Sequence, residues 1–531
     1  MSFNISELFE RVVDAVGDRL AVYTPARTLT FAELDERANR LAHVLRGLGV
    51  GKGDHVGLQL LNGTEYIEGM LASFKLSAVP INVNYRYVEG ELTHLFNDAG
   101  LVALIAHKQF CPVIDAVRSQ VPTLRQLVVV DDGSDTAEGE AALDYESALE
   151  SASGGRDWTG RSDDDLYIAY TGGTTGLPKG VIWRHKDLFF AALGGGDPII
   201  DKGPISEAAE LPSRLLEWPM KQLYAPPLMH VSAHWGVFNA FFGGSSVVLA
   251  SPGVFDPTEI WRLVGEQGVS LITVVGDAML QPLLDYIDSH PETERSSLFV
   301  LASGGALVSP VTKERISQLL PNVLFVDTLG ASETGIAGSR SGNETTRFTA
   351  DERTVVLDDE LQPVEPGSGV IGRLARKGHV PLGYHNDPEK TAKTFVEFDG
   401  YRWVLPGDMA TVAEDGSIEL LGRGSGCINT GGEKVFPEEV EAVLKSHPAV
   451  ADVLVVGVPD ERWGSRVVAV AALRPGQALD LASLQEHARS QLAGYKLPRD
   501  LCLVDEVVRG VNAKPDYKWA EAHARARLAN I

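Results

Sequence analysis

Short strand-like runs that alternate with helical segments are the feature that most constrains how this chain folds. Runs rich in β-branched residues lie at 55–60, 102–107, 126–132, 245–250, 269–275, 297–303 and 323–330. Segments with helical periodicity flank and separate them, as at 29–45, where Thr30 and Glu33 have the spacing of a capping box. Because a helix returns the chain to the start of the next parallel strand, this alternation predicts an α/β fold with largely parallel sheets.

The pattern changes near residue 423, and this change divides the chain into two parts. A length of 531 residues predicts several structural units, at about 100–200 residues per domain. Residues 411–423 predict a hairpin around an Asp-Gly turn, and residues 424–531 then have a β/α pattern of their own. We expect a large N-terminal domain at 1–423 and a small, mobile α+β C-terminal domain at 424–531, with a hinge near Ser425.

Two stretches of the large domain predict surface structure. Residues 131–165 are acidic and rich in Gly, Ser and Ala, which is typical of a surface excursion or a linker. Within them, the acidic run 163–165 predicts a solvated face. Residues 194–214 combine Gly, Pro and mixed charge and predict an exposed loop.

Charge and composition exclude several classes of protein. The chain has 72 acidic and 47 basic residues, so its formal net charge is −25, which argues against nucleic acid or an anionic membrane as the main partner. No apolar run reaches the ~18–20 residues of an integral membrane segment, and the first residues do not resemble a secretory signal. Cys111, Cys427 and Cys502 are too scattered for a disulfide framework or a zinc site. We therefore expect a cytoplasmic protein.

The string YTGGTTGLPKGV at 170–181 is the strongest chemical signal in the chain. Its glycines let backbone N–H groups approach phosphate oxygens, its hydroxyls donate further hydrogen bonds, and Lys179 supplies positive charge. It is not a Walker A loop, because Lys179 lies between a proline and a glycine. The residues expected to bind a polyphosphate are Thr171, Gly172, Gly173, Thr174, Thr175, Gly176 and Lys179.

This string resembles the phosphate loop of adenylate-forming enzymes, which include acyl-CoA synthetases, peptide-synthetase adenylation domains and luciferases. Further motifs follow in the order that the family has, and the resemblance covers nearly the whole chain. They are Ser303-Gly304-Gly305-Ala306, Leu329-Gly330-Ala331-Ser332-Glu333, Pro406-Gly407-Asp408, Gly422-Arg423 and the segment VNAKPDYKW around Lys514. The resemblance implies the adenylate-forming fold, with a large α/β domain and a small C-terminal domain that carries the catalytic lysine.

The resemblance also implies a role for each motif. Glu333 would hold Mg²⁺, Asp408 would bind both ribose hydroxyls, and Arg423 would reach ribose or phosphate. Lys514 would bridge the substrate carboxylate and the α-phosphate, so that Lys514, Glu333 and Lys179 are the expected catalytic residues. The other positions expected to contact nucleotide or CoA are Gly304, Gly305, Ala306, Asp327, Leu329, Gly330, Ser332 and Lys434.

Three positions depart from the family pattern. Leu329 replaces the usual aromatic residue, and Pro406 replaces a threonine beside the ribose aspartate. Ser425 stands at the pivot, where the family usually has a charged residue, although the adjacent glycines keep backbone freedom. Lys434 lies where the family has a cation, and it could equally belong to ordinary loop chemistry.

The segment PPLMHVSAHW and the helix that follows it predict part of the acyl pocket. The resemblance places a histidine such as His230 beside that pocket. Trp235 and Phe238 could line it or pack in the core, and Gly304 and Gly330 would border it. His230 and His234 have the i, i+4 spacing of a metal pair, but no third ligand is evident in the sequence.

Longer strings resemble actinobacterial fatty-acyl and steroid side-chain CoA ligases. They include NVNYRYVEGEL, GRGSGCINTGGEKVFPEEVE and AGYKLPR. The resemblance implies an enzyme that joins a carboxylic acid to CoA with ATP and Mg²⁺, releasing AMP and pyrophosphate, with a long-chain or bulky acid as substrate. A homodimer is compatible with it. The alternatives are an enzyme that loads a carrier protein and a catalytically silent module that binds nucleotide or acyl-adenylate.

Overall fold

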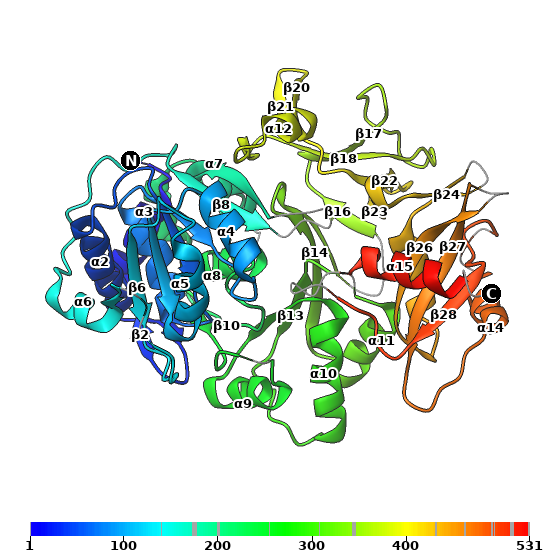
Figure 1. The fold of residues 1–531 in the computed structure, drawn as a ribbon, viewed down its shortest axis with the longest axis horizontal. Coiled ribbons are helices and arrows are strands. Elements are labelled where there is room, and N and C mark those ends of the chain that lie inside the picture. Colours follow the sequence, from blue (N-terminus) through cyan, green and yellow to red (C-terminus); the bar gives the residue numbers. More distant parts are fainter. Residues whose placement is uncertain are drawn as a thin grey trace.

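The chain folds into two large β-sheets, a layer of helices packed on them, and a separate C-terminal unit (Figure 1). The computed structural model describes residues 2–137, 139, 141–171, 178–198, 202–253, 255–306, 308–341, 347–430, 433–460, 464–489, 492, 494–509 and 515–528. Among these residues, no helix combines the length and the apolar character needed to cross a membrane.

The first sheet has eight strands and lies in the N-terminal part of the molecule. Its order is β19 (Gly383–Tyr384), β9 (Lys179–Arg184), β8 (Leu166–Thr171), β4 (Val79–Asn82), β3 (His55–Gln59), β5 (Ala103–His107), β6 (Gln126–Val130) and β7 (Leu143–Asp144). The strands from β8 to β7 are parallel, whereas β9 is antiparallel to both β8 and β19. The helices of this part are α1 (Ile5–Val16), α2 (Phe31–Gly47), α3 (Thr64–Lys75), α4 (Glu89–Asp98), α5 (Cys111–Arg118), α6 (Tyr145–Ser151) and α7 (His185–Ala192), with the 3₁₀-helix η1 (Lys108–Phe110).

The second sheet has fifteen strands and changes character along its length. Its first strands are β2 (Thr28–Thr30), β1 (Leu20–Tyr23), β11 (Ser246–Val248), β10 (Lys221–Tyr224), β12 (Leu271–Val274), β13 (Val300–Gly304) and β14 (Leu324–Ala331). The others are β15 (Gly335–Ser341), β16 (Arg347–Ala350), β23 (Ile418–Arg423), β22 (Asp408–Val412), β18 (Gly372–Lys377), β21 (Tyr401–Val404) and β20 (Phe395–Phe398), with β17 (Thr354–Leu357) beside β18. All pairs from β1 to β14 are parallel, and every later pair is antiparallel.

The predicted α/β class is confirmed, but the parallel arrangement ends at β14. Helices α8 (Val231–Phe242), α9 (Pro257–Gln267), α10 (Gly276–Ser289) and α11 (Pro310–Leu319) accompany the parallel half. After β14 the chain forms hairpins, with α12 (Pro388–Thr394) as its helix in this region. The predicted hairpin at 411–423 is present as the antiparallel pair β22–β23.

The main core lies under α1, α2, α3, α7 and α8. Phe9, Phe31 and Phe241 are fully buried there, with ring centroids 5.5–6.0 Å apart, and Phe74 is buried 5.8 Å from Phe238. The predicted capping box starts α2: the Glu33 N–H donates to Thr30 Oγ1, and Glu33 accepts a bond from the Thr30 N–H at 2.8 Å. The N-cap hydrogen bonds and the buried apolar stripe therefore both favour the helix α2.

Two expectations of surface structure hold only in part. Within 163–165, Asp164 is exposed as expected, but Asp165 is buried and accepts hydrogen bonds from Asn4 Nδ2 at 2.9 Å and Ser77 Oγ at 2.7 Å. Residues 194–214 contain the 3₁₀-helices η2 (Gly194–Gly196) and η3 (Ala208–Arg214), and Ile205 and Leu211 join the main core. Contacts with segments distant in sequence bury Asp165, Ile205 and Leu211, whereas exposed residues such as Asp164, Glu207 and Ser213 fit the expectation; local composition does not reveal such contacts.

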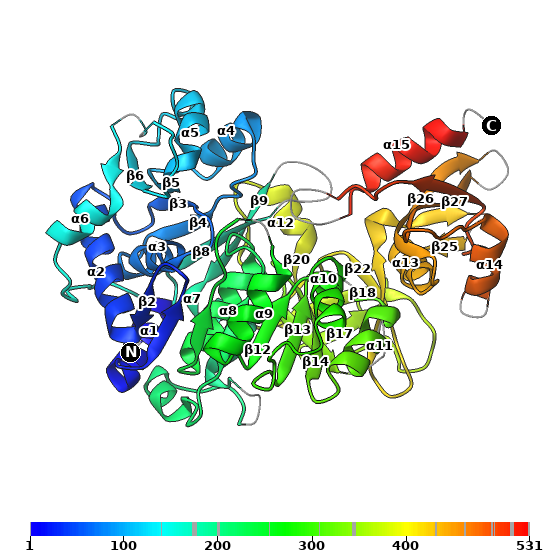
Figure 2. The same ribbon diagram turned by 90° about the horizontal axis from the view of Figure 1, so that it is seen from below.

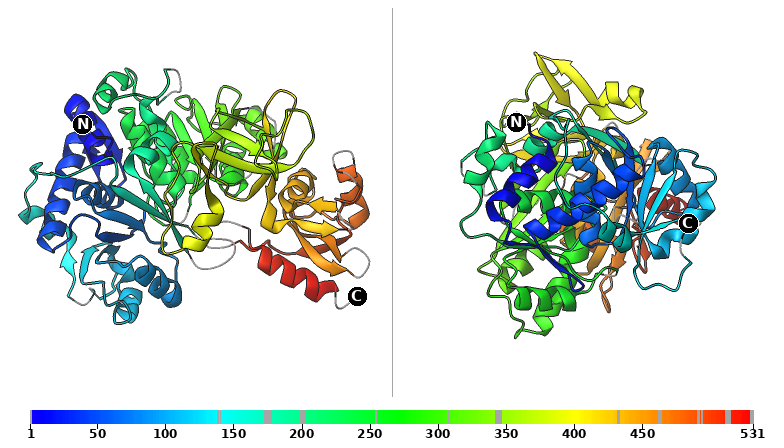
Figure 3. Two further views of the ribbon diagram at one scale, coloured as in Figure 1. Left: turned by 90° about the horizontal axis from the view of Figure 1, so that it is seen from above. Right: turned by 90° about the vertical axis from the view of Figure 1, so that its left-hand side faces the viewer.

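Residues after β23 form a small unit at one end of the molecule, coloured orange to red (Figures 2 and 3). Its strands are β24 (Ile428–Thr430), β25 (Glu433–Val435), β26 (Val450–Asp460), β27 (Gly464–Leu473) and β28 (Asp500–Val504), after the 3₁₀-helix η4 (Gly424–Gly426). Its helices are α13 (Pro437–Lys445), α14 (Leu481–Arg489) and α15 (Tyr517–Leu528). One buried cluster packs α13 and α14 on the β26–β28 sheet, and a second packs α15 on the sheet.

Candidate active site

Strands β8 and β9 hold the two ends of the predicted phosphate loop. They are antiparallel, and Thr171 pairs directly with Lys179. The side chain of Asn82 fixes the end of β8, since its Nδ2 donates to the Tyr170 carbonyl at 2.8 Å and its Oδ1 accepts from the Tyr170 N–H at 2.7 Å. The predicted residues between these strands lie outside the described part of the chain: Gly172, Gly173, Thr174, Thr175 and Gly176.

Lys179 is held by an aspartate that the sequence did not single out. Its Nζ lies 2.5 Å from Asp387 Oδ2, and 42% of the lysine side chain is exposed. The other oxygen of Asp387 accepts a bond from the Lys390 N–H at 3.0 Å and caps α12. The Lys179 hydrogen bond is the first cause of the lowered pKa of Asp387. The Asp-Pro-Glu pattern at 387–389 could have revealed the helix cap, but not the ion pair.

Glu333 lies in the turn between β14 and β15, near the end of β19. Its Oε1 accepts a hydrogen bond from the Tyr384 hydroxyl at 2.9 Å. The turn is fixed from a second side, because Trp183 Nε1 donates to the Ser332 carbonyl at 2.9 Å. Tyr384 pairs with Val181 on β9, so this strand joins the predicted metal ligand to the strand that carries Lys179. Sequence reasoning missed Tyr384, whose partner is 51 residues away.

The Glu333 carboxylate fits Mg²⁺ as the expected metal. Mg²⁺ is usually bound by one or two carboxylates together with phosphate oxygens and waters. The Tyr384 hydroxyl binds Oε1, and no described residue donates a hydrogen bond to Oε2, which is the second hard oxygen donor of this carboxylate. The described residues contain no group of three or more His, Cys, Asp and Glu that could hold a metal. The pair His230 and His234 therefore has no third ligand among them. A metal ion that also binds phosphate oxygens does not need three protein ligands.

The glycine motifs lie at the carboxyl ends of neighbouring parallel strands, where ligands of α/β sheets bind. Gly304 pairs with Thr328 in the β13–β14 ladder, and a Cβ at Gly304 would lie 2.4 Å from Thr328 Oγ1. A Cβ at Gly330 would lie 2.7 Å from the Gly335 carbonyl. Close packing therefore favours glycine at both positions, against the Thr328 side chain at Gly304 and against a backbone carbonyl at Gly330. Gly305 has a positive φ of 81°, and it is exposed together with Ala306.

Leu329 and Asp327 face protein groups. Leu329 packs against a small apolar cluster that includes Val356 and Leu374. Asp327 is buried and forms ion pairs with Arg340 and, at 3.7 Å, with Lys313. Burial and the Arg340 charge lower the pKa of Lys313 to about 8. The Asp327 carboxylate is therefore engaged inside the β14–β15 pair, and this placement offers no support for a direct contact with a cofactor.

The predicted ribose residues lie opposite each other at the ends of two neighbouring strands of the large sheet. Asp408 begins β22 and pairs with Arg423, the last residue of β23. The Gly424 N–H donates to the Gly407 carbonyl at 2.9 Å, which fixes the first residue beyond this pair. The side chains of Arg423 and Ser425 lie outside the described part of the chain, as do the Lys434 side chain on β25 and the whole of Lys514.

The residues expected at the acyl pocket lie at and in α8. His230 precedes the first turn of α8 and is half-buried. Trp235 is buried edge-on against Trp183, with ring centroids 6.2 Å apart, so it lies behind the Ser332 turn. Phe238 is 2% exposed and packs against Phe74 within the main core.

His234 has a structural environment. Its ring nitrogens lie 2.7 Å from the Leu228 carbonyl and 2.5 Å from the Tyr167 hydroxyl. Burial lowers the pKa of His234 to about 4, which keeps the ring neutral near pH 7. Both nitrogens are therefore engaged in fixing the start of α8.

Comparison with known proteins agrees with this geometry. Residues 9–385 match the AMP-binding enzyme family, and residues 439–514 match the AMP-binding enzyme C-terminal domain. The chain is 45% identical to a 3-oxocholest-4-en-26-oate--CoA ligase of Rhodococcus rhodochrous, over 100% of this chain and 97% of the relative. It is 44% identical to a medium/long-chain-fatty-acid--CoA/3-oxocholest-4-en-26-oate--CoA ligase of Mycobacterium tuberculosis, over 100% of this chain and 98% of the relative.

Solved structures resemble the chain over nearly its whole length. The anthranilate CoA ligase AuaEII in complex with anthranoyl-AMP has a TM-score of 0.86 and 25% identity, over 99% of this chain and 98% of that one. ATP-bound MatB from Rhodopseudomonas palustris has a TM-score of 0.83 and 26% identity, over 98% of this chain and 99% of that one. Family match, full-length relatives and shared fold lead to one conclusion: this chain belongs to the AMP-binding enzymes.

Proposed function

We propose that the chain is an AMP-forming acyl-CoA ligase. The observation that carries this proposal is the 44–45% identity, along the full chain, to CoA ligases of acids, together with Lys179 and Glu333 joined through one strand pair. In the first step a carboxylate oxygen attacks the α-phosphorus of ATP, and pyrophosphate leaves. In the second step the CoA thiol loses its proton and attacks the acyl carbon, and AMP leaves with the bonding electron pair.

The chain's own residues mainly position charge in the first step. Lys179 meets the phosphates at the end of the loop that begins at Thr171, and the Ser332 hydroxyl contacts the α-phosphate. Mg²⁺ held by Glu333 would neutralise charge on phosphate oxygens. Lys514 neutralises the substrate carboxylate and the α-phosphate as they approach. Charges placed in advance lower the barrier because they need no rearrangement during reaction.

The substrate we propose is a steroid side-chain acid or a medium- to long-chain fatty acid. The names of the relatives motivate this assignment. His230 and Trp235 would border the acyl pocket, with Gly304 and Gly330 opening space beside the sheet. Pocket shape decides among acids, and one methylene changes binding by only about 1–3 kcal/mol.

We also propose that residues 1–423 and 424–531 act as two domains around a hinge near Ser425. The separate buried clusters of the small unit support this division. Asp408 and Arg423 would bind the ribose on the large-domain side of the hinge. Lys434 would move with the small domain and contact nucleotide or CoA.

Mass spectrometry of acyl-AMP and acyl-CoA tests the proposal. Purified protein is incubated with ATP, Mg²⁺, CoA and acids ranging from acetate through long fatty acids to steroid side-chain acids. Acyl-CoA from the bulky acids is expected. Acyl-AMP that accumulates despite CoA would instead indicate a carrier-protein acceptor, and nucleotide binding without any adenylate would indicate a silent module.

Replacement of the C-terminal lysine separates the two half-reactions. Lys514→Ala is expected to abolish acyl-AMP formation, while thioester formation from supplied acyl-AMP largely persists. Equal loss of both half-reactions would contradict the role proposed for Lys514.

A further inference from the structure

A five-residue segment, 383–387, contacts both of the charged groups on which the proposed chemistry depends. Its Tyr384 donates to Glu333 Oε1 at 2.9 Å, and its Asp387 lies 2.5 Å from Lys179 Nζ. The segment belongs to neither the phosphate loop nor the β14–β15 turn. It nevertheless connects the candidate metal ligand to the candidate phosphate cation.

This segment is fixed by the backbone of β9 and by α12. Gly383 pairs with Ile182, and the His385 N–H donates to the Gly180 carbonyl at 2.8 Å. The Tyr384 N–H donates to Thr391 Oγ1 at 2.9 Å. Gly383 has a φ of 151°, and a Cβ there would lie 2.5 Å from Thr391 Cγ2. Only glycine allows this close approach, which sets the position of the tyrosine that follows.

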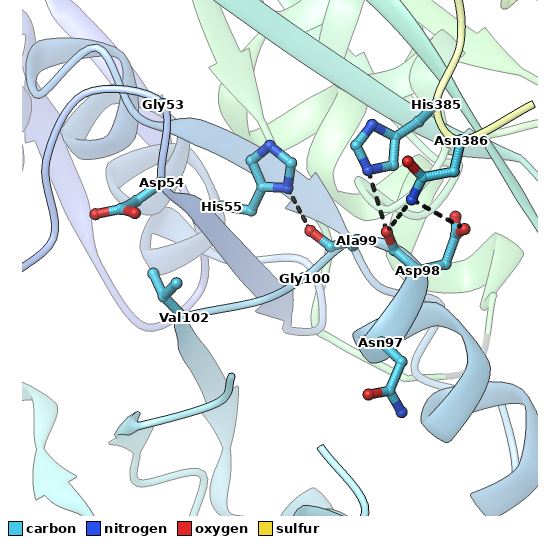
Figure 4. Close-up of a pocket in the computed structure, with 10 residues that line it drawn as sticks. All are labelled: Gly53, Asp54, His55, Asn97, Asp98, Ala99, Gly100, Val102, His385 and Asn386. Carbon is cyan, nitrogen blue, oxygen red and sulfur yellow. Dashed lines mark hydrogen bonds between the residues drawn. The ribbon is translucent and has the colours of Figure 1, made fainter. Parts of the chain in front are cut away.

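The end of α4 holds the same segment from the other side, beside a polar hollow of about 330 Å³ (Figure 4). The Asp98 carbonyl accepts from Asn386 Nδ2 at 2.9 Å and lies 3.1 Å from His385 Nε2. Asp98 Oδ2 accepts from the Tyr170 hydroxyl at 2.7 Å, and Tyr170 directly precedes Thr171. One aspartate therefore ties the start of the phosphate loop to the segment that carries Tyr384.

A cation lies on the ring of the tyrosine. Lys390 Nζ is 3.9 Å from the centroid of the Tyr384 ring. A cation over an aromatic face is attracted to the ring, which holds the ring plane in place. It also makes the phenolic O–H a stronger donor, because neighbouring polar groups polarise one another at low local dielectric. Ring, hydroxyl and carboxylate thus form one oriented chain that ends at Glu333.

We infer that Tyr384 is a positioning residue that orients the Glu333 carboxylate for its metal. This inference rests on the proposed function. The hydroxyl fixes Oε1, so rotation of the carboxylate about its last bond is restricted and Oε2 is presented in one direction. Partners that orient a metal ligand in this way typically change metal affinity by 10–100-fold when removed. The structure thus gives Tyr384 a role in metal affinity and not in phosphate binding.

Tyr384→Phe tests this role, because it deletes one hydroxyl and keeps the ring. Mn²⁺ is titrated into the full chain in the presence of α,β-methylene-ATP, and free Mn²⁺ is followed by electron paramagnetic resonance. We expect the Mn²⁺ dissociation constant to rise about 10-fold. The affinity for the nucleotide analogue at saturating metal is expected to stay within about 2-fold, since Lys179 and the phosphate loop are unchanged.

Tyr145→Phe is the matched control. The Tyr145 hydroxyl donates to Glu68 Oε2 at 2.6 Å, so it forms the same kind of tyrosine–glutamate bond, between α6 and α3 in the main core. This variant is expected to melt at a lower temperature and to bind Mn²⁺ with the dissociation constant of the unmodified chain. An unchanged Mn²⁺ affinity in Tyr384→Phe, or the same loss in both variants, would overturn the inference.

The metal titration also separates this inference from the proposed function. The readout does not require turnover, so it applies even when no acid in the panel is adenylated. A chain that forms no acyl-AMP but shows the 10-fold shift would overturn the ligase proposal and leave the role of Tyr384 standing. A chain that forms acyl-CoA but lacks the shift would support the ligase proposal and overturn the role of Tyr384.

Discussion

Two lysines of the N-terminal part, Lys75 and Lys179, contact carboxylates in opposite ways. Lys75 on α3 is fully buried, and its Nζ lies 2.8 Å from Glu10 and 2.7 Å from Asp35. Lys179 at the start of β9 is 42% exposed and contacts one carboxylate, that of Asp387. The first lysine joins α1, α2 and α3 in the core, whereas the second lies at the end of the phosphate loop.

The difference shows how a structural cation is distinguished from one that is available for a ligand. Burial by itself would raise the pKa of Glu10, but Arg161 and Lys75 outweigh it and lower that pKa. Every charge in the Lys75 group is thus compensated inside the protein. Lys179 keeps an exposed face, and Asp387 is its one ion-pair partner among the described residues. A phosphate oxygen can replace Asp387 at little cost, because exposed ion pairs contribute only about 0.2–1 kcal/mol. An exposed lysine whose charge is only partly compensated is therefore a better candidate for ligand binding than a buried lysine that is fully paired.

The largest expected effect is on the buried side of this comparison. Lys75→Met leaves Glu10 and Asp35 without their common cation, and we expect the free energy of unfolding to fall by about 3–5 kcal/mol. Urea denaturation followed by circular dichroism measures it. Acyl-AMP formation per folded molecule should be unchanged; a specific loss of activity in the folded fraction would break the comparison.

The second effect is at the candidate active site, on the same side of the comparison as Lys179, and it changes activity. Glu333→Gln keeps the acceptor for Tyr384 but removes the negative charge expected to hold Mg²⁺. We expect acyl-AMP formation at limiting Mg²⁺ to fall about 10²-fold, equivalent to about 2.7 kcal/mol, with an unchanged melting temperature. Pyrophosphate exchange measures the rate, and Glu68→Gln in the core should show the opposite pattern of low stability and normal activity per folded molecule.

A pH titration of stability sharpens the comparison. Because the folded pKa of Glu10 is lowered, the group stabilises the fold above its unfolded pKa of about 4.5 and this contribution is lost as pH falls through the folded value. One such group adds at most about 1.4 kcal/mol per pH unit to the slope. Glu10→Gln should therefore flatten the acid limb of unfolding free energy against pH, and an unchanged slope would show that Glu10 does not titrate with folding.

The smallest effect concerns the Asp387 side chain. Asp387→Asn keeps a good cap for α12 but removes the charge that competes for Lys179. We expect KM for ATP to fall up to about 5-fold, in line with an exposed pair of at most about 1 kcal/mol. Steady-state kinetics at saturating acid measure it. A higher KM would show that Asp387 positions the lysine and does not compete with phosphate.

The sequence predicted those parts of the fold whose signals are local. The capping box of α2, the hairpin β22–β23 and the α/β alternation each depend on residues close together in the chain. The glycines at 304 and 330 were also singled out, and the structure shows the close contacts that favour them, with a side chain at Gly304 and with backbone at Gly330.

Parts that depend on distant contacts could not be predicted in this way. The bond from Lys179 to Asp387 spans 208 residues, and that from Asn4 to Asp165 spans 161. Composition at 163–165 indicates solvent, yet Asn4 and Ser77 bury Asp165. The switch from parallel to antiparallel pairing at β14 likewise follows from how the turn after Gly330 returns the chain, because the β14 pattern itself resembles that of the preceding strands.

The pairing of Asp408 with Arg423 affects how far the proposed domain rotation moves each group. The chain leaves the large sheet immediately after this pair, so an axis through 424–426 passes beside the proposed ribose contacts. Displacement in a rotation grows with distance from its axis. Groups at this pair would therefore hardly shift, whereas α14 at the outer end of the small unit would move along a long arc (Figures 1 and 2). A nucleotide could thus remain at its ribose contacts while the chemistry around its phosphates is exchanged.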